Sequence, residues 1–464
     1  MPEQAALEQL REFILHDGGR LYAGAVPGGL ALADSQQALL VLGPPRSGKT
    51  SAVAVPNVLC APGAVIATST KADVLMSTIE SRSQMGRCWL MDPSGSIGLD
   101  PPGVTRLRWS PVAAASTWDD SLVMARAMTQ AARPAGRQGE SAHWTERAEA
   151  LLGPLLHAAF LSGDGIDDVL GWTLRQDLGP AQATLHANGL PVAADALGGI
   201  ASTDRRELSG IWSSLAGVLA AYRSDAVLDN STAVNFDPAA FAQSSDTVYI
   251  CAPARHQDLT SPIVVAFLEQ IRSAAYSARA TAGQSMAAAP PVTMVLDELA
   301  NIAPLPDLPG LVSEGGGQGV LTVGCLQDLS QARVRWGPAA DGFLSLFGTK
   351  LVLPGIGDLS TLELVSKLGG EVDVPVRSVS RSSAWGPGYG SPTVTWSTQR
   401  QRRIPPEAVN QLPKGSALLL AGPRPPEYVS LPPWWLQEPF SNVRRSRLER
   451  PLEPAQAEIR TLGR

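Results

Sequence analysis

The chain has 464 residues, enough for two to four domains or one elaborated domain, and 44% of them are hydrophobic. Its formal net charge of −6 argues against a histone-like protein coated in positive charge, although a basic surface confined to a channel would be compatible with it. No uncharged apolar run reaches about 18 residues, the length that spans a bilayer. We therefore expect a cytoplasmic protein, which only a partner would recruit to the inner face of the cell membrane.

Short apolar runs along the chain predict buried strands, because their apolar residues are continuous rather than alternating. Most of these runs are followed by a cluster of Gly, Pro, Ser or Asp and then by a helical stretch. The predicted strands are Ala38–Leu42, Ala64–Thr68, Cys88–Met91, Thr247–Cys251, Val292–Leu296, Val320–Cys325, Leu351–Leu353 and Ala417–Leu420. Strands that alternate with helices predict an α/β fold with a mostly parallel sheet covered on both faces.

The strand pattern stops at about Val112 and does not resume until Thr247. The helices predicted in between are Trp118–Ala132, Ala142–Leu161, Ile166–Arg175, Pro180–Asn188 and Asp204–Arg223. We expect an all-α domain inserted into a split α/β domain. The predicted boundaries are 1–111 for the first α/β part, 112–236 for the insertion, 237–430 for the second α/β part and 431–464 for a C-terminal tail. From Ser441 onward the tail has few apolar residues and many arginines, so we expect the tail to be mobile.

The first predicted strand leads into a loop with the Walker A pattern G-x-x-x-x-G-K-[ST], which binds nucleotide phosphates. Glycines let backbone N–H groups converge on phosphate oxygens, and the helix that starts near Gly48 points its positive end at the anion. Lys49 is expected to reach the β and γ phosphates of ATP, and the Thr50 hydroxyl to ligate magnesium. The predicted nucleotide-binding residues are Gly43, Pro44, Pro45, Arg46, Ser47, Gly48, Lys49 and Thr50.

A second acidic motif lies at the end of the predicted strand 292–296, where Asp297 and Glu298 follow directly. Asp297 would hold magnesium through water, and Glu298 would polarise the water that attacks the γ phosphate. Taken alone, such acids often simply begin a loop. Downstream of a Walker A loop, we interpret them as a Walker B motif.

The predicted strand 320–325 leads into Gln327 and Asp328. Gln327 at a strand end next to the site would contact the γ phosphate or the water and report hydrolysis. Alternatively, Asp328 caps a helix and Gln327 is simply exposed. The residues themselves leave both interpretations open.

A later segment, residues 374–406, contains no acidic residue and is rich in arginine. Its aromatic residues are Trp385, Tyr389 and Trp396. Arginines hold phosphates and aromatic rings stack on unpaired bases, so the segment would suit nucleic acid. The alternative, which we favour, is an ordinary exposed β-hairpin with solvated arginines.

These motifs together resemble the TraG/TraD family of type IV secretion coupling proteins, hexameric DNA-pumping ATPases of conjugation. The matching segments span nearly the whole chain: Leu42–Thr50, Ser69–Asp73, Leu90–Pro93, Arg108–Pro111, Trp144–Leu155, Leu296–Ile302, Pro306–Ser313, Leu326–Gln331, Phe343–Lys350 and Ile404–Pro413. The resemblance implies a RecA-like P-loop NTPase core, a homo-oligomeric ring with ATP sites between subunits, and DNA in the ring channel. It assigns catalytic roles to Lys49, Glu298 and Gln327, and magnesium binding to Thr50 and Asp297. It also implies that the all-α domain recognises a DNA-processing, relaxase-like protein or other protein cargo.

The sequence departs from this family in two places. Family members usually begin with transmembrane helices, which this sequence lacks, so we expect a separate membrane or secretion-channel partner. Many members also carry an arginine finger in the loop that here reads Ser313–Gly319 and contains no arginine. Arg333 and Arg335 are the first substitutes, with surface ion pairs as the simpler interpretation. These departures motivate an alternative function, a soluble ATP-dependent docking platform that selects protein cargo without pumping DNA.

Overall fold

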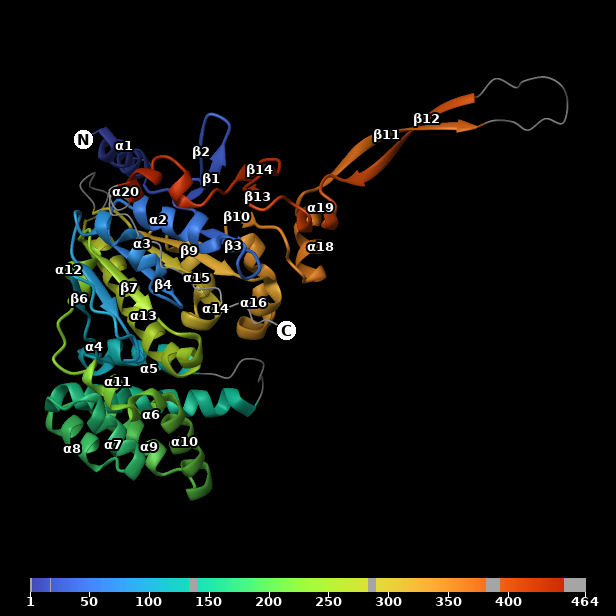
Figure 1. Ribbon diagram of the computed structural model, residues 1–464. Coiled ribbons are helices and arrows are strands. Elements are labelled where there is room, and N and C mark those ends of the chain that lie inside the picture. The colour runs from blue at the N-terminus through green and yellow to red at the C-terminus, as the bar shows by residue number, and fades with distance from the viewer. Residues whose placement is uncertain (1, 17, 133–139, 283–288, 381–392, 446–464) are drawn as a thin grey trace, which may run out of the picture.

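A large mixed sheet forms the centre of the computed structural model, which describes residues 2–16, 18–132, 140–282, 289–380 and 393–445. The sheet has 12 strands in the order β2-β1-β14-β13-β10-β3-β9-β8-β4-β7-β5-β6 (Figure 1). All the predicted strands belong to it: β3 (Leu39–Leu42), β4 (Val65–Ser69), β5 (Cys88–Met91), β7 (Thr247–Cys251), β8 (Val292–Leu296), β9 (Val320–Leu326), β10 (Thr349–Val352) and β13 (Ser416–Ala421). The predicted α/β fold with a mostly parallel sheet is confirmed.

The edges of the sheet differ from the prediction. β13 pairs with β10 in the antiparallel direction, because a continuous apolar run indicates burial but carries no information about strand direction. The sequence pattern also missed four outer strands. The residues of three of them are largely exposed or half-buried: β2 (Gly29–Leu32), β6 (Val104–Arg106) and β14 (Glu427–Ser430). The fourth, β1 (Tyr22–Val26), is buried over its first three residues. Exposed edge strands do not produce the continuous apolar signal of the central ones.

Helices cover both faces of the sheet. α1 (Pro2–His16), α2 (Val55–Cys60) and α3 (Asp73–Arg82) pack on the face to which Leu39 and Val41 point. The opposite face, with Leu40 and Leu42, packs against α13 (Gln257–Ala282) and its neighbours. Those neighbours are α14 (Leu299–Ile302), α15 (Leu308–Glu314), α16 (Leu329–Trp336), α17 (Phe343–Leu346), α18 (Leu359–Leu368) and α19 (Pro406–Asn410).

Between β6 and β7 the described residues form helices and no strand, and most of these helices gather at one end of the molecule (Figure 1). They are α4 (Pro111–Ala114), α5 (Trp118–Ala131), α6 (Glu140–Ser162), α7 (Ile166–Arg175), α8 (Gly179–Ala187), α9 (Pro191–Ala201), α10 (Arg205–Val218), α11 (Asp225–Asp229) and α12 (Pro238–Ala242). One apolar core joins them to the sheet, since Leu151 and Ile211 belong to the same buried cluster as Leu40 and Met294.

A two-stranded antiparallel ribbon, β11 (Glu371–Ser380) and β12 (Thr393–Arg402), projects from the body of the molecule (Figure 1). This is the hairpin that we favoured. Arg400 lies 3.6 Å from Asp373 and 3.8 Å from Glu371, and Arg402 lies 2.8 Å from Glu363. Nucleic-acid binding by this segment stays a prediction, and its residues Trp385 and Tyr389 lie outside the described residues.

The start of the predicted mobile tail, 431–464, is instead packed against the body. Its described part forms η5 (Trp434–Leu436) and α20 (Ser441–Arg445). Phe440 is fully buried, and its ring makes an edge-on contact with Tyr22 at a centroid distance of 5.1 Å. Leu431, Trp434 and Phe440 thus anchor a segment whose overall composition suggested disorder; residues 446–464 lie outside the described residues. Across the described parts of the chain, no helix is long and apolar enough to cross a membrane.

Candidate active site

The loop between β3 and the next helix has the backbone that a phosphate site requires. It runs from Gly43 to Lys49 and enters η1 (Thr50–Ala54), a short π-helix that continues into α2. Gly48 has a φ of +102°, a conformation that side chains disfavour. At Gly43 a Cβ atom would lie 2.9 Å from the Cβ of Leu353, so only glycine fits there. The glycines of the motif are therefore explained by the geometry of the loop.

Lys49 and Ser47 are among the loop residues that line a cavity of about 570 Å³. The Lys49 ammonium donates to the backbone carbonyls of Gly43 and Pro44, which hold it within the loop. The Ser47 hydroxyl is buried and has no hydrogen-bond partner among the described residues. A buried hydroxyl without a partner costs free energy, and a bound phosphate oxygen would satisfy it.

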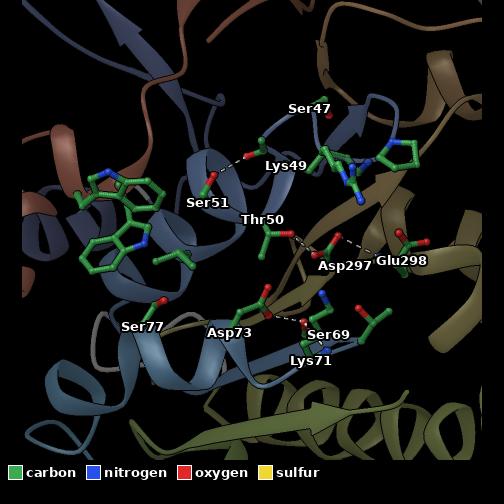
Figure 2. A pocket seen from close by; sticks show the side chains of 17 residues that line it. Ser47, Lys49, Thr50, Ser51, Ser69, Lys71, Asp73, Ser77, Asp297 and Glu298 are labelled. Carbon is green, nitrogen blue, oxygen red and sulfur yellow. Dashed lines mark hydrogen bonds between the residues drawn. The ribbon is translucent and has the colours of Figure 1, made fainter. Parts of the chain in front are cut away.

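The phosphate loop and the acidic motif after β8 meet at Thr50 and Asp297 (Figure 2). The Thr50 hydroxyl donates to Asp297 Oδ2 at 2.6 Å. Burial raises the pKa of the Asp297 carboxyl, and the hydrogen bond from Thr50 opposes that rise. Thr68, on the neighbouring strand β4, donates to the backbone carbonyl of Asp297 at 2.7 Å and fixes the end of β8.

Glu298 follows in an unusual backbone conformation. Its φ of +54° and ψ of +46° are left-handed, which costs a non-glycine residue about 1 kcal/mol or more. The Glu298 N–H donates to Asp297 Oδ1 at 3.1 Å, and Asn301 Nδ2 donates to Glu298 Oε2 at 3.2 Å. The result is a half-buried carboxylate that lines the cavity next to Asp297.

Gln327 follows β9, which lies between β3 and β8 in the sheet, so the residue sits between the loop and Asp297. Its backbone N–H donates a hydrogen bond to Gln331 Oε1 at 3.0 Å, and its side chain is not among those that line the cavity. Asp328 accepts hydrogen bonds from the N–H groups of Ser330 and Gln331 and so caps α16, as the simpler interpretation expected. The sensor role of Gln327 stays a prediction.

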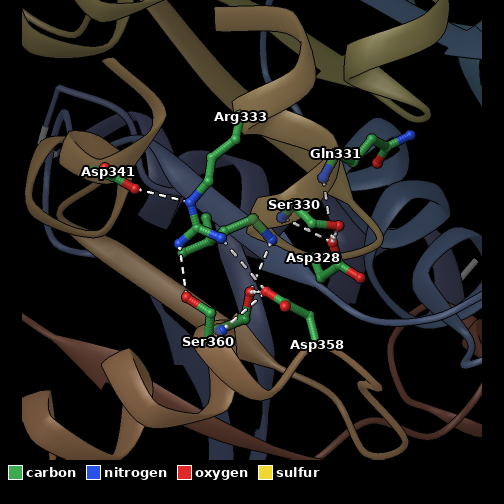
Figure 3. A network of polar contacts seen from close by, with 9 residues as sticks. Asp328, Ser330, Gln331, Arg333, Asp341, Asp358 and Ser360 are labelled. Carbon is green, nitrogen blue, oxygen red and sulfur yellow. Dashed lines mark hydrogen bonds and ion pairs between the residues drawn. The ribbon is translucent and has the colours of Figure 1, made fainter. Parts of the chain in front are cut away.

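The two substitute arginines are held by other groups of their own chain. Arg333 lies 2.9 Å from Asp341 and 3.6 Å from Asp358, and it donates to Ser360 at 3.2 Å (Figure 3). Arg335 donates to the backbone carbonyl of Ala131 at 2.7 Å. The ion-pair interpretation is confirmed for Arg333, whereas Arg335 fastens α16 to the inserted helices.

Other residues of the cavity did not appear in the predicted site. Ser69, Lys71 and Asp73 line it from the end of β4 to the start of α3, and the Ser69 hydroxyl donates to Asp73 Oδ1 at 2.8 Å. Trp434 and Trp435 line it from the C-terminal segment. The two tryptophans were missed because the segment was expected to be mobile; its one signal was the apolar run Leu431–Leu436 within a polar tail.

The residues present fit a magnesium nucleotide. Magnesium prefers oxygen ligands and keeps waters and substrate phosphates in its shell, so one hydroxyl and one carboxylate suffice from the protein. Thr50 and Asp297 supply that pair. Among the described residues, no three His, Cys, Asp or Glu side chains gather into a metal site.

Comparison with known proteins gives a family and a fold. Residues 6–447 match the family described as Type IV secretory system Conjugative DNA transfer. No curated protein matches the chain in sequence. The unbound bacterial conjugative coupling protein TrwBΔN70 is 18% identical, with a TM-score of 0.67 over 92% of this chain and 91% of that chain. TrwB with ADP and Mg²⁺, and TrwB with the ATP analogue ADPNP, each give 18% identity and a TM-score of 0.65 over 92% of both chains. The shared fold is a RecA-like P-loop core with a helical domain.

Proposed function

Because the chain belongs to the type IV secretory system conjugative DNA-transfer family, we propose that it is an ATP-driven translocase. In this proposal it delivers a DNA or DNA–protein substrate to a type IV secretion channel. Family membership supports the role in conjugative DNA transfer. The observation that supports the ATPase is the 2.6 Å contact between Thr50 and Asp297, which joins the phosphate loop to the acidic strand end.

In the proposed reaction the chain binds and orients a nucleotide. The N–H groups of the loop and the Ser47 hydroxyl bind phosphate oxygens, and Lys49 exchanges its carbonyl partners for the β and γ phosphates. Thr50 and Asp297 would hold magnesium, which when bound neutralises charge on the phosphates. Glu298 accepts a proton from the attacking water, for which its half-buried position at the cavity wall is suitable.

The proposed partners follow from the family and from the arrangement of the chain. We propose a homo-oligomeric ring, hexameric by analogy, with DNA in its channel. The inserted helices, which gather at one end of the molecule, would bind a relaxase-like or other protein cargo (Figure 1). A membrane or secretion-channel partner would recruit the ring.

One observation favours the second candidate function, an ATP-dependent docking platform that does not pump DNA. The loop at 313–319 has no arginine, and Arg333 is engaged by Asp341 and Asp358. An arginine finger is worth about 10³–10⁵ in rate, so a site without one would hydrolyse slowly. DNA dependence of turnover separates the two functions.

The test is ATP turnover with and without single- and double-stranded DNA, for wild type, Lys49→Ala and Glu298→Gln, across protein concentrations that permit ring assembly. The translocase predicts that DNA raises turnover and that both substitutions abolish it, with Glu298→Gln still binding ATP. Turnover indifferent to DNA would overturn the translocase in favour of the docking platform. If the wild type neither binds nor hydrolyses ATP, both functions are wrong.

A further inference from the structure

The nucleotide cavity has a second, aromatic end. Figure 2 shows two indole rings on the side of Ser51 and Ser77, opposite Glu298, and the tryptophans of the lining are Trp434 and Trp435. They reach the cavity from η5, which packs against η1, the helical turn that follows the phosphate loop. Two segments far apart in the chain therefore close the cavity on the side away from the acidic residues.

The two tryptophans are held in different ways. Trp434 is 8% exposed and belongs to the buried cluster that contains Phe440 and Tyr22, so it anchors the segment. Trp435 is 37% exposed, and its ring makes an edge-on contact with Trp434 at a centroid distance of 5.9 Å and an interplanar angle of 86°. Trp435 is thus the more exposed of the two tryptophans that line the cavity.

We propose that Trp434 and Trp435 form the base subsite of the nucleotide site, with the Trp435 ring stacked on the nucleobase while the phosphates lie on residues 43–50. This rests on the proposed nucleotide-binding function. The cavity volume of about 570 Å³ lies within the range of about 300–1,000 Å³ that is usual for small-molecule sites. If the phosphates of the nucleotide bind at Lys49, the base lies at the tryptophan end of the cavity.

The same lining defines the class of base. The residues that line the cavity include no Asn or Gln, the side chains that pair with the adenine edge, and the Asp73 carboxylate already accepts a hydrogen bond from Ser69. Ser51 and Ser77 lie at the tryptophan end of the lining (Figure 2). Stacking on an aromatic face tolerates any base, so the subsite takes adenine and guanine nucleotides with little preference.

The experiment uses tripolyphosphate as a probe that has the phosphates but no base. Binding of ATP, GTP and tripolyphosphate, each with magnesium, is measured on the full chain for wild type and Trp435→Ala. Stacking contributes about 1–3 kcal/mol per base, so Trp435→Ala should weaken ATP and GTP about 5- to 150-fold. Tripolyphosphate should bind wild type and variant equally, and wild type should bind ATP and GTP with similar affinities, both tighter than tripolyphosphate.

Three variants serve as controls. Trp435→Phe keeps an aromatic face and should retain most of the ATP affinity. Leu436→Ala alters the neighbouring residue, which is 70% exposed and does not line the cavity, and should bind like wild type. Lys49→Ala should weaken all three probes.

Each contrary result has its own meaning. Unchanged ATP and GTP binding by Trp435→Ala, or an equal loss for tripolyphosphate, overturns the base subsite but leaves the nucleotide site intact. A strong preference for ATP over GTP overturns the predicted tolerance for both bases. If the wild type binds none of the probes, or Lys49→Ala binds them all normally, the proposed function fails and the subsite with it.

Discussion

Replacement of Thr50 by Val tests the link between the phosphate loop and the acidic strand end. The substitution keeps the branched shape of the side chain and removes the hydroxyl that donates to Asp297 at 2.6 Å. A hydrogen bond to a charged group contributes about 1.5–3 kcal/mol. We therefore expect the affinity for magnesium nucleotide to fall about 10- to 150-fold, because Asp297 loses its donor and magnesium loses a ligand.

The same substitution should change how binding and stability depend on pH. Burial raises the pKa of Asp297 and Thr50 opposes this, so Thr50→Val should raise that pKa further and make nucleotide binding fail at a higher pH than in wild type. A carboxyl whose pKa rises on folding stabilises the protein below its unfolded-state pKa and loses that contribution as pH rises through the folded-state pKa. The variant should therefore lose more unfolding free energy at neutral than at acid pH.

Calorimetric titration with ADP, with and without magnesium, measures how far Thr50→Val lowers the affinity for the nucleotide. Thr50→Ser keeps the hydroxyl and should bind like wild type. Adding Asp297→Asn to Thr50→Val should cost less than the sum of the single losses, because the two groups interact directly. Normal magnesium-dependent binding by Thr50→Val, or an equal loss without magnesium, would refute the proposed metal pair.

Three other substitutions test features outside this pair. Arg82→Met removes a fully buried guanidinium that donates hydrogen bonds to Thr247 and to three backbone carbonyls. Each hydrogen bond contributes about 1 kcal/mol, so urea titrations should show an unfolding free energy lower by about 4 kcal/mol. Arg333→Ala should leave maximal ATP turnover unchanged, since Asp341 and Asp358 already engage this side chain; a loss of about 10³-fold would identify it as the missing finger. Trp396→Ala, at a side chain that is 67% exposed, should leave thermal stability unchanged, and a loss of single-stranded DNA affinity would show that the projecting ribbon binds nucleic acid.

The central part of the fold was predictable because each inner strand is buried on both faces. β5, β7 and β8 have the very bounds that their apolar runs indicate. The phosphate loop and the acids after β8 were predictable as motifs. The meeting of Thr50 with Asp297 follows from the sheet order, since the loop that leads to Thr50 and the acid Asp297 both follow the carboxyl ends of parallel strands. Their roles in binding and hydrolysis stay predictions.

What the sequence did not reveal depends on contacts between distant segments. The packing of Phe440 on Tyr22 and of η5 on η1 joins the two ends of the chain, and local composition carries no trace of such a pairing. The antiparallel direction of β13 is likewise set by how the chain returns after the projecting ribbon. Gln331 accepts from the Gln327 backbone one helical turn away, a contact that the sequence permits but does not require.

The single apolar core that joins the sheet to the inserted helices has a consequence for cooperativity. Two parts that share one core have no separate folding free energies, and they are expected to unfold in one transition. A cargo protein that binds only the native inserted helices would then stabilise the nucleotide site by RT ln(1 + L/Kd), where L is the free cargo concentration, without touching the site. Thermal unfolding would measure this coupling directly, because bound cargo and bound nucleotide would raise the same melting temperature.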